Sequence, residues 1–164
     1  MFNDLILNLT DFVAGLSPWL QAFGVALISL IPFVESYLGT FIGVLVGMNP
    51  WLALVAAVIG NTICTFALIA AASRTRRAVI ARRQDPEAAA PSKRRQRIAG
   101  YLERFGVPGV SLLGPLALPS QFTAPTMVAL GASARSVYFW MGISIVAWGV
   151  LFGFFGNWAA GVLV

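Results

Sequence analysis

Residues 50–72 read PWLALVAAVIGNTICTFALIAAA, a run of 23 residues without a charged side chain. At 1.5 Å per residue, a helix of this length covers about 34 Å, which is enough to cross the roughly 30 Å hydrocarbon core of a bilayer. Asn49 and Pro50 supply the expected N-cap and first-turn proline, and basic residues follow from Arg74. The stretch therefore predicts a transmembrane helix.

The composition agrees with a membrane protein. The chain has 164 residues, of which 59% are hydrophobic and 10% are charged, whereas soluble domains average about 25% charged residues. It has no His and one Cys, Cys64, so a disulfide within the chain, a His/Cys metal site and a Ser-His-Asp or Cys-His catalytic site are all excluded. We therefore expect an all-α integral membrane protein without enzymatic activity, metal or cofactor.

The basic residues are concentrated in one segment. Residues 74–104 carry ten of the eleven Lys and Arg, and such segments beside membrane spans stay in the cytoplasm, with some attraction to anionic lipid headgroups. Aromatic residues do not interleave with the charges, so we expect no nucleic-acid partner. With this linker inside, the chain is expected to be a multi-pass protein of the inner (plasma) membrane with its C-terminus outside.

The first 31 residues predict two helices. Apolar residues recur at helical spacing between Phe2 and Leu16, with Asp4 and Asp11 on the opposite side. This pattern fits either an amphipathic helix on the membrane surface or the first turns of a longer, tilted span. Ser17-Pro18 then predicts a helix start, and this second helix should end at Pro32.

Residues 32–73 predict a re-entrant hairpin followed by the span described above. The apolar run 37–48 has only 12 residues, a length typical of a re-entrant segment. Its glycines at 39, 43 and 47 would give one smooth face for close helix packing.

Glu35 is the only Asp, Glu, Lys or Arg between Phe12 and Ser73. Since a carboxylate at membrane depth costs several kcal/mol, Glu35 is the strongest pointer to function.

Residues 105–156 predict a second hairpin and span, separated from the first by a solvated linker at 81–97. Four prolines between residues 106 and 132 should prevent any regular helix, and irregular backbone at membrane depth is tolerated where it is buried or lines a cavity. The polar tip would be 118–123. A last span should run from Ala134, capped by Ser133, to about Phe155, with a tail at 157–164. The prolines are Pro108, Pro115, Pro119 and Pro125.

The two halves correspond when Gly47 is aligned with Gly131, an offset of 84 residues that also pairs Ser36 with Ser120. Because the two spans should run in opposite directions, the hairpins would enter from opposite faces and form an inverted repeat. Interrupted segments at matching places in two halves are typical of a transport site near the bilayer midplane.

Two motifs resemble those of known families. Pro32-x-x-Glu35 with the glycine-rich helix after it, together with residues 101–109 (YLERFGVPG) and 116–119 (LALP), resembles the small multidrug export family. Arg104-Phe105-x-x-Pro108 resembles the Arg-Phe-x-x-Pro motif of the related DedA/SNARE-associated (VTT) superfamily. The resemblance covers about residues 28–155. It implies export of small molecules or movement of lipids.

Three functions remain open. The first is a transporter of lipophilic or cationic small molecules, in which Glu35 exchanges a proton for the solute. The second is a lipid translocase or scramblase, with Ser111 among the headgroup contacts, and the third is a membrane scaffold without a substrate. Gly149 and Gly153 would also permit a homodimer. The candidate substrate or ion contacts are Glu35, Ser36, Asn61, Arg104, Ser120, Gln121 and Thr123, and the candidate hairpin prolines are Pro32, Pro108, Pro115, Pro119 and Pro125.

Overall fold

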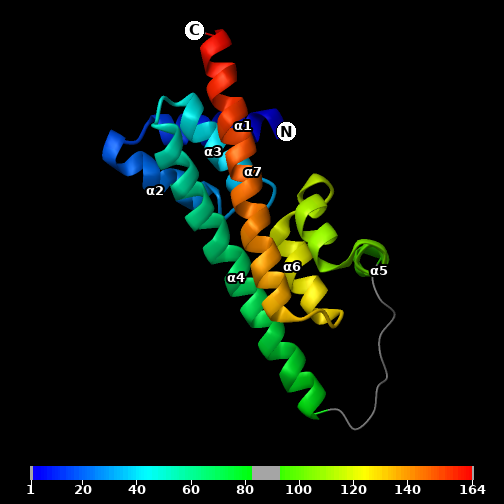
Figure 1. Cartoon of the computed structure of the whole chain (residues 1–164). Coiled ribbons are helices and arrows are strands. Elements are labelled where there is room, and N and C mark those ends of the chain that lie inside the picture. The colour runs from blue at the N-terminus through cyan, green and yellow to red at the C-terminus, as the bar shows by residue number, and fades with distance from the viewer. Residues whose placement is uncertain (1, 83–92, 164) are drawn as a thin grey trace. The chain divides into compact units, whose positions relative to one another are not determined.

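The computed structural model describes residues 2–82 and 93–163, and every regular element among them is a helix (Figure 1). The all-α fold class is thus confirmed. The elements are α1 (Phe2–Ala14), α2 (Pro18–Ile28), α3 (Glu35–Leu45), α4 (Pro50–Arg82), α5 (Lys93–Leu113), the 3₁₀ turn η1 (Gly114–Leu116), α6 (Ser120–Ala129) and α7 (Ala134–Leu163).

The chain divides into two compact units. Unit 1 comprises Met1–Cys64 and Ser144–Val164, and unit 2 comprises Thr65–Ile143. The two long helices are therefore shared: α4 gives its first part to unit 1 and its second part to unit 2, and α7 does the reverse. Besides one part of each long helix, unit 1 contains α1, α2 and α3, and unit 2 contains α5, η1 and α6.

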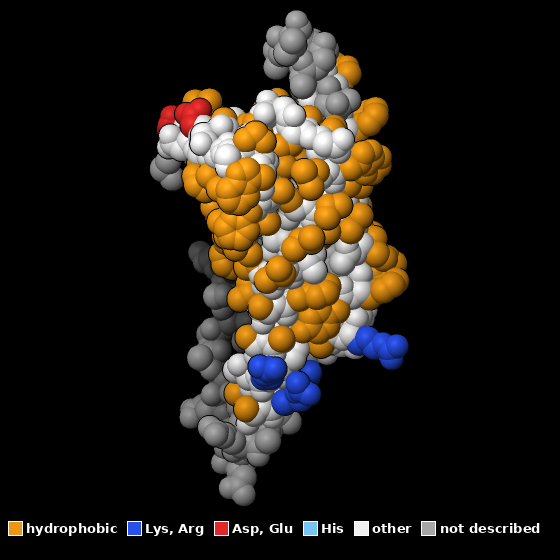
Figure 2. Space-filling model, turned by 90° about the vertical axis from the view of Figure 1, so that its left-hand side faces the viewer, with side chains coloured by type: hydrophobic (Ala, Val, Ile, Leu, Met, Phe, Trp, Pro, Cys, Tyr) orange, Lys and Arg blue, Asp and Glu red, His pale blue; other side chains and the backbone are white. Residues whose placement is uncertain are grey.

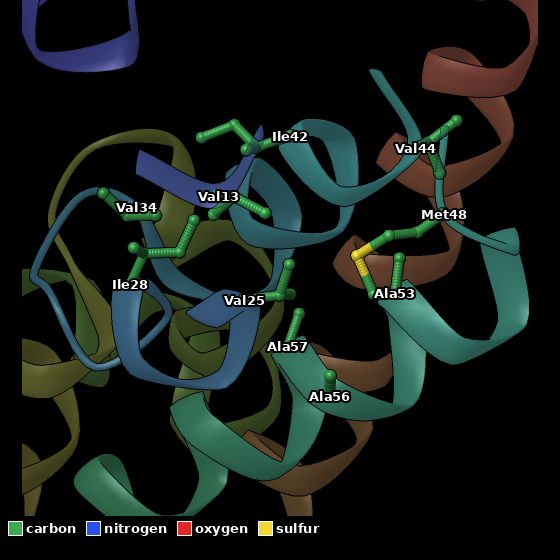
Figure 3. Packing of buried hydrophobic residues seen from close by; sticks show 10 residues of the cluster. All are labelled: Val13, Val25, Ile28, Val34, Ile42, Val44, Met48, Ala53, Ala56 and Ala57. Carbon is green, nitrogen blue, oxygen red and sulfur yellow. The ribbon is translucent and has the colours of Figure 1, made fainter. Parts of the chain in front are cut away.

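The core of unit 1 forms where α1, α2, α3 and the start of α4 meet (Figure 3). Val13 of α1, Val25 of α2 and Ile42 of α3 are completely buried there. The part of α4 that packs against them carries the small side chains of Ala53 and Ala57. Small side chains on α4 let the short helices approach its backbone closely. This packing fixes the position of α3, whose first residue is Glu35.

The core of unit 2 forms around α6. Met127 and Val128 of α6 pack with Ile69 of α4, Ile98 of α5 and Met141 of α7. All are buried. α6 is thus held by α5 and by parts of both long helices, as α3 is held in unit 1 by α1, α2 and the start of α4.

The prediction that four prolines exclude regular helix is wrong in part. Pro108 lies in the first turn after a break at Gly106, where φ is 63°, Pro115 begins η1, and Pro119 is the N-cap of α6. Proline is tolerated at these places because the N–H that it lacks would have no partner within the helix. Only Pro125 lies inside a helix, α6. The segment is interrupted as expected, but its pieces are helical.

Several predicted boundaries shift. α2 ends at Ile28, before Pro32, and α7 continues through Leu163 into the expected tail. α4 continues to Arg82 and α5 begins at Lys93, so both ends of the expected linker 81–97 are helical, while 83–92 lie outside the described residues.

The predicted helix starts have mixed outcomes. Asn49 caps α4 as predicted, accepting hydrogen bonds from the N–H groups of Trp51 (3.0 Å) and Leu52 (3.3 Å). Ser17 has the extended backbone of an N-cap, but its side chain makes no capping bond.

The glycines of residues 37–48 divide into two kinds. A side chain on Gly39 would collide with Ser29 and one on Gly43 with Ala53, so these two give α3 the close packing that their spacing predicts. Gly47 does not share that face. It follows α3 with φ of 85° and open space around it, so it ends the helix, where a positive φ favours glycine.

Within the described residues, two helical stretches are long and apolar enough to cross a membrane, Pro50–Val79 and Ala134–Gly156. Only 39% and 33% of their most apolar windows are buried. Trp51 is 72% exposed and Phe154 is 77% exposed, and hydrophobic side chains cover much of the face drawn in Figure 2. A core helix of a soluble domain would be mostly buried instead.

Candidate functional site: buried polar residues at two helix starts

The turn that leads into α3 holds Glu35 in an unusual backbone conformation. Phe33 and Glu35 both have positive φ, 75° and 51°, and L-residues pay about 1–2 kcal/mol for the left-handed region. The N–H groups of Val34 and Glu35 both donate to the carbonyl of Ile31, at 3.1 and 3.2 Å. Phe33 is 51% exposed, whereas Glu35 is 2% exposed. The strained turn therefore directs a carboxyl group inward.

Two neighbours of Glu35 join α3 to α7 within unit 1. The hydroxyl of Ser36 donates a 2.7 Å hydrogen bond to the carbonyl of Ile145. The ring of Tyr37 lies 5.1 Å from that of Phe152 and 6.5 Å from that of Trp148, while its hydroxyl donates to the carbonyl of Phe33 at 2.8 Å. Tyr37 thus supports the turn and the helix contact together. No local sequence pattern predicts this role for Tyr37.

The charged side chains of unit 1 are all acidic. Its sequence contains three carboxylates, Asp4, Asp11 and Glu35, and no Lys, Arg or His. Asp4 and Asp11 are exposed, and Glu35 is buried. The predicted contact Asn61 is also buried in this unit. A unit of this charge favours a cation over an anion as its ligand.

The start of α6 gathers buried polar groups in unit 2. Pro119 is the N-cap, with φ of −56° and ψ of 143°. The hydroxyls of Ser120 and Thr65 lie 3.3 Å apart, and that of Thr123 donates to the carbonyl of Pro119 at 3.0 Å. Gln121 is 2% exposed. Three predicted contacts, at 120, 121 and 123, therefore lie on one turn, but this turn has no carboxylate.

The ends of α3 and α6 have the same backbone hydrogen bonds. After α3, the N–H groups of residues 46, 47 and 48 donate to the carbonyls of 42, 44 and 43. After α6, those of 130, 131 and 132 donate to 126, 128 and 127. Gly47 and Gly131 both have positive φ, and the pattern is that of a Schellman cap. Every residue number differs by 84, the offset that the sequence suggested.

The remaining predicted contact, Arg104, has a different environment. It is exposed on α5, with its guanidinium 5.2 Å from the ring centre of Phe105, whereas Ser120, Gln121 and Thr123 are buried.

Two serines add buried hydroxyls: Ser111 in unit 2 and Ser144 in unit 1 have no hydrogen-bond partner for Oγ among the described residues. The sequence predicts Ser111 only as a headgroup contact, and it does not predict a role for Ser144, because one serine in an apolar run is not a distinct signal.

The described residues contain no group of three or more His, Cys, Asp or Glu that could hold a metal ion. No protein-family model matches this chain, and neither does any curated protein or solved structure. The geometry of the two helix starts is therefore the basis for a functional proposal.

Proposed function

We propose that this chain is a small integral membrane transporter that exports lipophilic or cationic small molecules, with Glu35 as the residue that binds the solute or exchanges it for a proton. The observation that carries the proposal is the burial of Glu35 at the start of α3, in a unit whose sequence has carboxylates and no basic side chain. Intramembrane carboxylates are costly and are typically functional.

The membrane part of the proposal is supported by the two long apolar helices and by the faces that they leave exposed. On α4, exposed side chains recur at Trp51, Val55, Ile59 and Ile63, one helical turn apart, as expected for a lipid-facing stripe. Residues 74–104 would lie in the cytoplasm because they are the basic segment. The chain would then be multi-pass in the inner membrane.

The repeat part is supported by the matching hydrogen bonds after α3 and α6. It is also supported by the antiparallel pairing of α4 and α7 in each unit. In unit 1 Gly149 lies against Leu54 and Val58, and in unit 2 Tyr138 donates to the carbonyl of Phe66. Two oppositely directed copies would place the α3 and α6 starts as re-entrant tips, the arrangement of many secondary transporters. The resemblance to small multidrug export proteins points to the same function.

The experiment is solute transport by the full chain in proteoliposomes. With a pH gradient imposed, uptake of tetraphenylphosphonium should require the protein and fall at least about tenfold in Glu35→Gln, which removes the charge and keeps the shape. Glu103→Gln is the matched control, because Glu103 is exposed on α5. Normal transport by Glu35→Gln would overturn the role of Glu35, and no uptake by the unmodified protein would overturn transport of such cations.

A second candidate is lipid translocation, which one feature of unit 2 favours. A cavity of about 220 Å³ lies among α5, η1 and α6, lined by apolar side chains such as Ile98, Val110 and Leu118, with Thr123 at its polar part. An apolar cavity beside buried hydroxyls suits an amphiphile. The assay follows the fluorescence of labelled phosphatidylcholine, which an external quencher removes when the lipid reaches the outer leaflet. If this function is correct, the fluorescence should decay faster in proteoliposomes than in protein-free vesicles. If it is not, the two rates should match.

A further inference from the structure

The second part of α4, the turn after α6 and the start of α7 line an open cavity of about 480 Å³ within unit 2. Three arginines, Arg74, Arg76 and Arg77, line it from α4. From the other side it is lined by the turn after α6 and by the first residues of α7, including Gly131, Ser133 and Ala134. None of the described residues that line it is acidic.

One of these arginines, Arg76, reaches the turn after α6. A terminal guanidinium nitrogen of Arg76 lies 3.6 Å from the point that a side-chain carbon on Gly131 would occupy. Gly131 has φ of 113°, so glycine both permits the turn and leaves room for the guanidinium. Nε of Arg77 donates to the carbonyl of Ser73, one turn earlier on α4, at 3.3 Å.

The opposite wall adds donors. Val137 is the first residue of α7 whose N–H bonds within the helix, to Ser133 at 3.0 Å. The N–H groups before it have no acceptor within the helix, and the positive end of the helix dipole lies beside them. Three guanidinium groups around one cavity also repel one another. Among the described residues of unit 2, the only acid is Glu103 on α5, and it does not line the cavity.

We propose that this cavity, between Arg74, Arg76 and Arg77 and the first turn of α7, binds a phosphate group, as the free anion or in the headgroup of an anionic lipid. Guanidinium groups bind phosphate oxygens through paired, charge-assisted hydrogen bonds. The arginines follow directly on the apolar stretch of α4, where a headgroup would lie beside a membrane-spanning helix. The site is separate from Glu35, and its occupation does not depend on transport.

The test measures binding by the full chain in a neutral detergent. Isothermal titration calorimetry at 150 mM salt would compare dioctanoyl phosphatidylglycerol, dioctanoyl phosphatidylcholine and inorganic phosphate. Arg74→Gln/Arg76→Gln should weaken binding of phosphatidylglycerol by at least about tenfold, since two charge-assisted contacts are lost. Arg97→Gln/Arg104→Gln removes the same charge from two residues of α5 that do not line the cavity and should change binding by less than about threefold, because salt screens charges outside the site.

The ligands distinguish the source of the phosphate. Binding of phosphatidylglycerol together with competition by inorganic phosphate would indicate a site for the anion itself, and binding of phosphatidylglycerol alone would indicate a lipid headgroup. Equal weakening in the two double variants, or no preference for phosphatidylglycerol over phosphatidylcholine combined with no binding of phosphate, would overturn the proposal.

A second measurement needs no variant and so does not depend on the folding of one. Phenylglyoxal modifies accessible arginines, and mass spectrometry locates the products. Phosphatidylglycerol or phosphate should protect Arg74, Arg76 and Arg77 at least about threefold while Arg97 and Arg104, which do not line the cavity, continue to react. Uniform reaction of all five in the presence of both ligands would contradict the site.

Discussion

Ser36 on α3 donates a 2.7 Å hydrogen bond from its buried hydroxyl to the carbonyl of Ile145 on α7, across 109 residues of sequence. This bond joins the residue after Glu35 to a long helix of unit 1. At the residue that corresponds to Ser36, Ser120 of α6 pairs with Thr65 of α4 in unit 2. In each unit the short helix is thus attached by a serine in its first turn to a long helix that belongs to the other half of the sequence.

The bond from Ser36 should contribute to stability. We expect Ser36→Ala to lower the free energy of unfolding by about 1–2 kcal/mol, because a buried hydrogen bond is lost. Thr75→Ala is the control, since the Thr75 hydroxyl bonds to the carbonyl of Ala71 within its own exposed turn. Equilibrium unfolding in detergent, followed by circular dichroism, measures both. An equal effect of the two substitutions would mean that the bond to Ile145 adds nothing.

Contact between α2 and α4 requires a glycine at position 60. A side-chain carbon there would collide with the backbone carbonyl of Ala26, which cannot rotate away. We expect Gly60→Ala to destabilise the protein by about 1–3 kcal/mol. Gly100→Ala, on α5 with open space around it, should instead stabilise by about 0.5–1 kcal/mol. Thermal unfolding of both variants checks the difference in sign.

The end of α3 depends on the left-handed conformation of Gly47. Because nothing lies within 4 Å of an added side-chain carbon, the cost of Gly47→Ala is conformational and should be about 1–2 kcal/mol. Gly47→Asn should cost less, since Asn tolerates this conformation better. The comparison of unfolding free energies tests the cap. If Asn and Ala cost the same, the left-handed backbone is not the cause.

The burial of Glu35 predicts selective chemistry. A lipophilic carbodiimide should label Glu35, and a water-soluble carbodiimide should not, because the carboxyl group is 2% exposed. Glu103, exposed on α5, should react with the water-soluble reagent. Peptide mass spectrometry of the full chain in liposomes locates the labels. Efficient labelling of Glu35 by the water-soluble reagent would place it at the surface and favour a scaffold over a transporter.

Much of the secondary structure followed from local patterns. The charge-free run at 50–72 predicted α4, and Asn49 and Pro50 predicted its start, since capping and helix length depend on neighbouring residues. The offset of 84 between Gly47 and Gly131 was also visible. The density of prolines led to the wrong prediction that residues 106–132 form no regular helix. The effect of a proline depends on its position within a helix, and Pro108 and Pro119 occupy positions where no N–H is needed.

The candidate site could be predicted only in part. A lone Glu35 in an apolar stretch was a clear signal, because burial of a carboxylate is costly whatever the fold. The strained turn at Phe33, the support from Tyr37 and the pairing of Thr65 with Ser120 gave no such signal. They depend on which helices meet, and those partners are far apart in the sequence.

The sequence by itself determined the all-helical class, the two long apolar helices and the lack of any other charged residue between Phe12 and Ser73, around Glu35. These are consequences of composition and local spacing. The tertiary structure alone decided that α3 packs on α7, that α6 packs with α4, and that Arg76 lies against the turn at Gly131. Those outcomes require contacts between distant segments, which side-chain shape and packing select and local sequence does not encode.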